Sequence, residues 1–193
     1  MTTTTDAQLL AQARTTPAAF ETLVIRHHDV IYRYVARRLG PNTAEDVVSE
    51  VFTTAYAIRS RYDADRPDAR PWLFGIATNM IRRHRKHEAQ VLDAYARTGV
   101  HPELPDAPHH DDELGPALAA ALGAMRREHR DVLLLHAIAD LSYEDIAVAM
   151  DVPIGTVRGW LSRARAVAAR ELAARGVLPT PSAIEIESKV TEP

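Results

Sequence analysis

The sequence has 193 residues, no cysteine and a formal net charge of −3 at pH 7. This length allows one ordinary domain or two small ones. The absence of cysteine excludes disulfides, thiolate catalysis and cysteine–zinc sites. No apolar run is long enough to span a membrane, and the polar start MTTTTDAQ does not have the pattern of a signal peptide. We therefore expect a cytoplasmic protein with no membrane insertion.

Charge is distributed unevenly along the chain. The net charge is +3 over residues 17–88, −5 over 89–113, +1 over 114–175 and −2 over 176–193. Two nearly neutral or basic blocks separated by an acidic strip predict two small helical domains joined by a flexible linker. The three prolines of GVHPELPDAPHHDD favour the linker, and Pro179 and Pro181 favour a disordered tail.

The first periodic segment begins at Pro17. Its apolar residues fall on one side of a long helix that Leu39-Gly40 ends well. His27 lies within this apolar face, and no second ligand stands four residues further on. We interpret it as a packed core residue rather than a metal ligand.

The segment AEDVVSEVFTTAYAI predicts a second helix with two different faces. One face is apolar and the other is polar, where Asp46, Ser49, Glu50 and Thr53 gather. From the pattern alone, this polar face is what a solvated helix surface would show.

The segment that follows Pro71, WLFGIATNMIRRHRKH, predicts a helix with a basic end. Leu73, Ile76, Ala77 and Met80 form its buried stripe. The opposite side carries Asn79, Arg82, Arg83 and Lys86, and Trp72 stands at its start. Cations beside an aromatic ring suit a separated DNA strand. The alternative is a solvated basic turn that complements the helix dipole.

Residues 114–139 predict supporting helices, and residues 142–169 predict a helix-turn-helix. Ser142 and Asp145 can form a capping box, Pro153 interrupts the helical pattern, and Thr156 is a candidate N-cap for the second helix. That helix has a narrow apolar stripe. Opposite it lies a surface of small residues framed by three arginines, as expected of a helix that enters a major groove. The members of that surface are Gly159, Ser162, Ala166, Arg158, Arg163 and Arg165. The alternative is an ordinary αα-hairpin with a solvated basic face.

Three of these strings resemble the extracytoplasmic-function (ECF) family of bacterial RNA polymerase sigma factors. LSYEDIAVAMDVPIGTVRGWLSRARA is similar to the family's region 4, AEDVVSEVFTTAYAI to region 2.2, and PWLFGIATNMIRRHRKH to regions 2.3–2.4. The resemblance covers roughly residues 17–175. It implies an all-α fold, with a region 2-like domain at 17–88, a linker at 89–113 and a region 4-like domain at 114–175.

The resemblance also implies partners and their sites. The partners are core RNA polymerase, through its β′ coiled coil and β subunit, and promoter DNA, with an anti-sigma factor as a further candidate. The residues expected at the −35 element are Thr156, Arg158, Gly159, Ser162, Arg163 and Arg165. Those expected at the −10 element are Trp72, Asn79, Arg82, Arg83 and Lys86. Those expected on polymerase are Asp46, Ser49, Glu50, Phe52 and Thr53.

The chain departs from the family pattern at several of these positions. Ser49 replaces the usual Gln, Arg83 stands where many members have Asp, and Gly159-Trp160 replaces a small polar residue followed by a basic one. The −10 preference of relatives that carry the Asp should therefore not be transferred, and Trp160 is expected to pack inward.

Two other classes of protein require features that this sequence lacks. A free-standing helix-turn-helix regulator would need a receiver domain or a dimerising segment, and residues 17–88 show neither a βα alternation nor a heptad repeat. A hydrolase or metal enzyme built on the histidines would need a motif such as HExxH, a P-loop or a nucleophile elbow, and the sequence contains none of these. We expect no catalysis, no cofactor and no metal.

Overall fold

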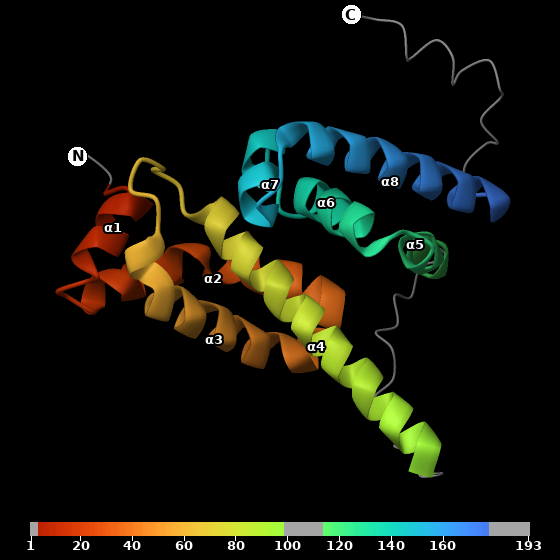
Figure 1. Ribbon diagram of the computed structural model, residues 1–193, viewed down its shortest axis with the longest axis horizontal. Helices are drawn as coiled ribbons and strands as arrows, with labels where there is room; N and C mark the ends of the chain where they lie inside the picture. Colours follow the sequence, from red (N-terminus) through yellow and green to blue (C-terminus); the bar gives the residue numbers. More distant parts are fainter. Residues whose placement is uncertain (1–3, 99–113, 178–193) are drawn as a thin grey trace, which may run out of the picture.

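The computed structural model describes residues 4–98 and 114–177. All the regular structure in these two ranges is helical, which confirms the all-α prediction (Figure 1). None of the described helices is both long and apolar enough to cross a membrane.

The N-terminal half contains α1 to α4. Their bounds are α1 (Asp6–Gln12), α2 (Ala18–Leu39), α3 (Pro41–Ile58) and α4 (Arg70–Thr98), with a short 3-10 turn at Arg59–Arg61. Gly40 separates α2 from α3 at a φ of 83°, which a residue with a side chain rarely adopts. Pro41 then occupies the first position of α3, where a missing N–H costs nothing.

The short first helix, α1, belongs to the core, although its sequence shows only a weak helical pattern. Thr5 and Gln8 form a reciprocal capping box, with Gln8 N–H donating to Thr5 Oγ1 at 3.3 Å and Thr5 N–H donating to Gln8 Oε1 at 2.9 Å. Leu9, Leu10 and Ala13 are buried.

The C-terminal half contains α5 (Leu114–Gly123), α6 (Arg127–Ala137), α7 (Tyr143–Met150) and α8 (Ile154–Ala174). Ser142 caps α7 by accepting a hydrogen bond from the backbone N–H of Asp145 at 3.1 Å. The Asp145 carboxylate accepts from the Ser142 hydroxyl at 2.8 Å rather than from its backbone, so the predicted capping box is half formed. Asp151, in the left-handed conformation at φ 54°, ends α7 at the start of the break predicted over Asp151, Val152 and Pro153.

Two details of the sequence-based prediction are corrected. Pro153, not Thr156, is the N-cap of α8, so Thr156 lies inside its first turn. In addition, α4 continues to Thr98. The first ten residues of the segment assigned to the linker are therefore helical, as the apolar residues Val91, Leu92 and Tyr95 in the sequence indicate. Residues 99–113 and the expected tail from 178 lie outside the described residues.

The two halves pack against each other through one continuous core. Buried residues of α1 to α4 and of α6 to α8 form a single cluster, and α4 lies against α7 (Figure 1). At this contact α4 and α7 approach so closely that a Cβ added to Gly75 would stand 2.5 Å from the carbonyl oxygen of Ala149.

Polar groups reinforce the contact between the halves. Asp131 of α6 is fully buried and accepts hydrogen bonds from two arginines of the N-terminal half, Arg38 and Arg82. The distance from Arg82 Nε to Asp131 Oδ2 is 2.8 Å. Arg70 donates to the backbone carbonyl of Ala139 at 2.6 Å. The halves therefore share both an apolar core and a buried ion-pair network.

Candidate nucleic-acid interface

The outer surface of α8 agrees with the geometry that its sequence predicts. Val157, Leu161 and Ala164 are buried in the stripe that faces α6 and α7. Arg158, Ser162, Arg163 and Arg165 are exposed on the other side, whereas Thr156 and Gly159 are half-buried beside them. Trp160 is half-buried and packs against the core, as expected.

Among the described contacts of this surface, only Arg165 is an arginine oriented by a side chain of a neighbouring helix. Both terminal nitrogens of its guanidinium lie 3.3 Å from the hydroxyl of Tyr143 on α7. Arg158 and Arg163 have no such partner in the described chain. Arg165 is thus held in place, while the other two are free to adjust to a ligand.

The polar side chains on the outer side of α4 fall into two groups. Arg83, Lys86 and Asn79 are exposed, as predicted. Arg82 is half-buried and bound to Asp131, and Arg85 donates to the backbone carbonyl of Arg38 at 2.6 Å. Trp72 is half-buried against Tyr62, with ring centroids 5.2 Å apart. Arg82 therefore differs from Arg83 and Lys86 in this structure, because it is half-buried and paired with Asp131.

Arg38 and Asp131 were not identified from the sequence as partners. The Arg38 side chain is only 3% exposed and donates to both Asp131 and the Tyr34 hydroxyl, the latter at 2.8 Å. Burial alone would lower the pKa of Arg38, but the neighbouring Tyr34 and Asp131 raise it above its ordinary value. A charged residue in an apolar helix stripe was the available signal, but sequence spacing could not name a partner 93 positions away.

The α3 surface combines an acidic face with a groove. Asp46, Ser49, Glu50 and Thr53 are exposed, and Phe52 is mostly buried. Ser49, Phe52 and Thr53 line a groove of about 460 Å³ between α3 and α2. The other residues of the groove wall are Phe20, Val24, His28, Glu45, Val48 and Tyr56.

The α2 side of this groove was missed by the sequence analysis. His28 stacks on Phe52 with ring centroids 6.3 Å apart, and Phe20 meets Tyr56 edge to face at 5.1 Å. These rings come from two helices, so the period within either helix gives no indication of the groove.

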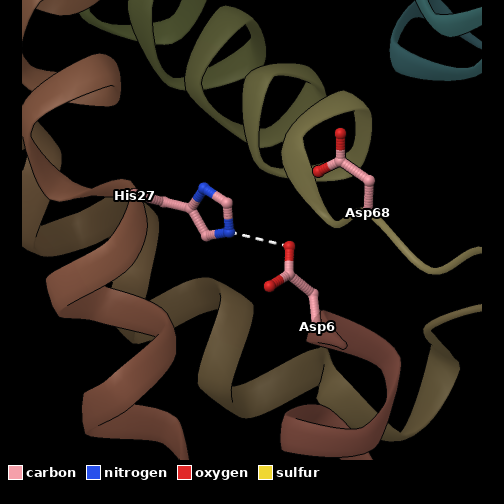
Figure 2. A group of neighbouring side chains, drawn as sticks. All are labelled: Asp6, His27 and Asp68. Carbon is pink, nitrogen blue, oxygen red and sulfur yellow. Dashed lines mark hydrogen bonds and ion pairs between the residues drawn. The ribbon is translucent and has the colours of Figure 1, made fainter. Parts of the chain in front are cut away.

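Asp6, His27 and Asp68 form the one cluster of possible metal ligands in the described residues (Figure 2). Both oxygens of Asp6 are already used: Oδ1 accepts from Arg26, and Oδ2 accepts from the backbone N–H of Ala69 at 2.9 Å and lies 2.7 Å from His27 Nε2. A guanidinium bound to the central carboxylate opposes a metal cation. We assign this cluster a structural role, in agreement with the interpretation of His27 as a core residue.

This geometry defines a class of protein: an all-α chain with a helix-turn-helix in one half and a basic helix beside an acidic, grooved surface in the other. The family model for Sigma-70 region 2 matches residues 23–90, and that for Sigma-70, region 4 matches residues 116–166. The chain belongs to the ECF family of RNA polymerase sigma factors.

Individual relatives agree with this assignment. The ECF RNA polymerase sigma factor SigE of Mycolicibacterium smegmatis is 33% identical over 153 residues, which are 76% of this chain and 59% of that relative. The RNA polymerase sigma-H factor of Pseudomonas aeruginosa is 30% identical over 174 residues, 83% of this chain and 90% of that one. The solved structure of CnrH in complex with the cytosolic domain of CnrY is 29% identical. Its TM-score is 0.64, over 88% of this chain and 97% of that one.

Proposed function

We propose that this chain binds core RNA polymerase and directs it to promoters whose −35 element α8 recognises and whose −10 element α4 helps to open. The observation that carries the proposal is that the two halves hold two different surfaces, an arginine-framed helix and an acidic grooved helix pair. A free-standing DNA-binding protein would need only the first surface.

The polymerase surface is the face of α3 with its groove. Asp46 and Glu50 supply negative charge on a rigid helix, and the groove beside Phe52 offers an apolar recess for a partner side chain. Charge beside an apolar recess suits a protein partner, because charge guides the encounter and apolar burial stabilises the complex. Ser49 and Thr53 line the same edge.

The two DNA elements are assigned to opposite halves. The −35 surface consists of Thr156, Arg158, Gly159, Ser162, Arg163 and Arg165. The −10 surface consists of Trp72, Asn79, Arg83 and Lys86, to which Arg82 is added when Asp131 releases it. The polymerase supplies the chemistry, so the chain itself performs recognition without catalysis. This work takes place in the cytoplasm with the polymerase, and an anti-sigma factor would compete for the same surfaces.

The experiment is run-off transcription with purified core polymerase on a library of candidate promoters. We expect the full chain to direct transcripts from a subset of templates and core polymerase alone to direct none. Asp46→Arg combined with Glu50→Arg should fold normally and reduce affinity for core polymerase by at least tenfold in a competition assay.

The matched control is Asp65→Arg, a charge reversal at an exposed loop position of the same half. It should leave core affinity unchanged. Loss of affinity in both variants would indicate a general charge effect, and no loss in either would remove α3 from the polymerase surface.

A further inference from the structure

A second concave surface lies beside the recognition helix. The end of α5, the start of α6 and the middle of α8 enclose a pocket of about 580 Å³. Its residues are Ala124, Arg126, His129, Arg163, Ala166 and Val167. Neither Arg126 nor His129 belongs to the surfaces predicted from the sequence.

Three cationic or proton-accepting side chains meet at this pocket. Arg126 and Arg163 are exposed, whereas His129 is buried, with 8% of its surface exposed. Within the described chain, no hydrogen bond or ion pair engages these three side chains. An apolar floor with two unengaged guanidiniums and an imidazole at its edge suits an anion, and guanidinium groups bind phosphate with two parallel hydrogen bonds.

The electrostatic environment of His129 supports the same interpretation. Burial, followed by the charges of Arg126 and Arg163, lowers the pKa of His129, and Glu128 opposes this only weakly. The imidazole is therefore close enough to both guanidiniums to be affected by them. An anion placed among the three would offset the repulsion that the two guanidiniums exert on a protonated His129.

The position of the pocket indicates which anion it receives. Arg163 and Ala166 belong both to the pocket and to the outer surface of α8. Arg163 directly follows Ser162, and Ala166 lies one turn beyond Ser162. If α8 enters a major groove, the sugar–phosphate backbone at the edge of that groove passes beside this flank.

We propose that Arg126, His129 and Arg163 together hold one backbone phosphate of the DNA that α8 binds. This inference rests on the proposed function, because it requires α8 to enter DNA. The contact adds affinity without sequence preference, and it places α6 in the DNA interface.

The contact also makes DNA binding depend on pH. A phosphate raises the pKa of His129 relative to the free protein, so binding takes up a proton wherever the free imidazole is neutral and the bound one is charged. Affinity for DNA should therefore increase as pH falls toward 6.5, the ordinary pKa of histidine.

The test measures binding of the holoenzyme, the full chain on core polymerase, to promoter duplex over a range of salt concentrations. Arg126→Ala and Arg163→Ala should each weaken binding on every template alike and reduce the salt slope by about one. Because both hold one phosphate, the double variant should lose less than the sum of the single losses. His129→Gln should remove the extra affinity at low pH.

Arg127→Ala is the matched control. Arg127 is an exposed arginine one position from Arg126, at the same helix end, and does not line the pocket. It should leave the salt slope of the parent unchanged. If Arg126→Ala and Arg163→Ala behave like Arg127→Ala while Arg158→Ala impairs binding, the pocket inference is wrong and the proposed function stands.

Two further outcomes separate the alternatives. If the parent holoenzyme binds no promoter at all, the proposed function itself fails. If inorganic phosphate raises the melting temperature of the parent but not of Arg126→Ala, and DNA binding is equal in both, the pocket is a site for a free anion. That result would overturn the DNA contact.

Discussion

Asp6 connects three segments that are far apart in the sequence. Its carboxylate binds His27 of α2 (Figure 2). It also accepts hydrogen bonds from Arg26 of α2 and from the backbone N–H of Ala69 just before α4. Burial would raise the pKa of Asp6, but the hydrogen bonds from His27 and Ala69 and the neighbouring charges hold it below its ordinary 3.8. The carboxylate thus fixes α1 and the loop before α4 onto α2.

We expect Asp6→Asn to lower the free energy of unfolding on the order of 1–3 kcal/mol, because an amide cannot satisfy three donors and carries no charge. A lowered pKa in the folded state means that this stabilisation is complete above pH 3.8 and is lost as pH falls below it. Denaturant unfolding at several pH values would measure both effects. Asp68→Asn, at the exposed member of the cluster, is the control and should change little.

Arg158 and Arg165 lie two turns apart on α8 but differ in how firmly neighbouring side chains hold them. Arg165 is held by Tyr143, which suits a fixed phosphate contact, and Arg158 is nearer the helix N-terminus that enters the groove. We expect Arg158→Ala to lose about 1–3 kcal/mol of binding, depending on the base opposite it. Arg165→Ala should weaken all sequences alike.

Binding of each variant to a library of −35 elements at two salt concentrations distinguishes these roles. Tyr143→Phe removes the hydroxyl that orients Arg165 and should show a smaller form of the Arg165→Ala effect. Equal, sequence-independent losses for Arg158→Ala and Arg165→Ala would remove base reading from Arg158.

At the scale of the helices, α4 shows what the sequence could and could not predict. Its apolar stripe predicted Leu73, Ala77 and Met80 as buried, because a single helix determines its own period. The partner of Arg82 could not be predicted, since Asp131 lies 49 residues away on another helix. The same reason explains the missed α2 wall of the groove, whereas the exposed residues of α3 and α8 followed from periodicity alone.

Asp131→Asn should loosen the packing of α6 on α2 and α4. It removes the charge that compensates Arg38, which is nearly inaccessible to water, and uncompensated buried charges are costly, at about 3–5 kcal/mol. We expect a larger radius of gyration in small-angle scattering and a less stable chain. Glu128→Gln removes one exposed charge from the same helix and should change neither quantity.

The chain's lack of cysteine offers a second readout of Asp131→Asn. Cysteines introduced at Ser60 and Ala174, both exposed, would carry fluorophores selectively and report the separation of the halves. An unchanged distance distribution in Asp131→Asn would show that the apolar core alone holds the halves together.

At the scale of the whole molecule, the packed arrangement conflicts with the proposed function. The −35 and −10 elements are named by their positions along the DNA, which differ by about 25 base pairs. This is roughly 85 Å along the duplex at 3.4 Å per pair. A compact chain of this length has a radius of gyration of about 16 Å. We therefore expect the two halves to separate when both elements are bound, which frees Arg82 from Asp131 for the −10 strand.

The glycine at position 75 has a consequence for how tightly the protein binds its partners. If only the open form engages polymerase and DNA, apparent affinity is the intrinsic affinity multiplied by the open fraction. Gly75→Ala should favour α4 itself by up to about 1 kcal/mol, since Ala is the better helix former. Its Cβ would nevertheless stand 2.5 Å from the Ala149 carbonyl oxygen, so the closed form must rearrange.

Each ~1.4 kcal/mol lost from closure would raise apparent affinity about tenfold, until most molecules are open. Gly123→Ala, where a Cβ meets nothing within 4 Å, should leave affinity as it was. A titration of core polymerase and promoter with both variants measures the open fraction directly. A chain made more active by one added methyl group would show that Gly75 keeps the resting protein closed.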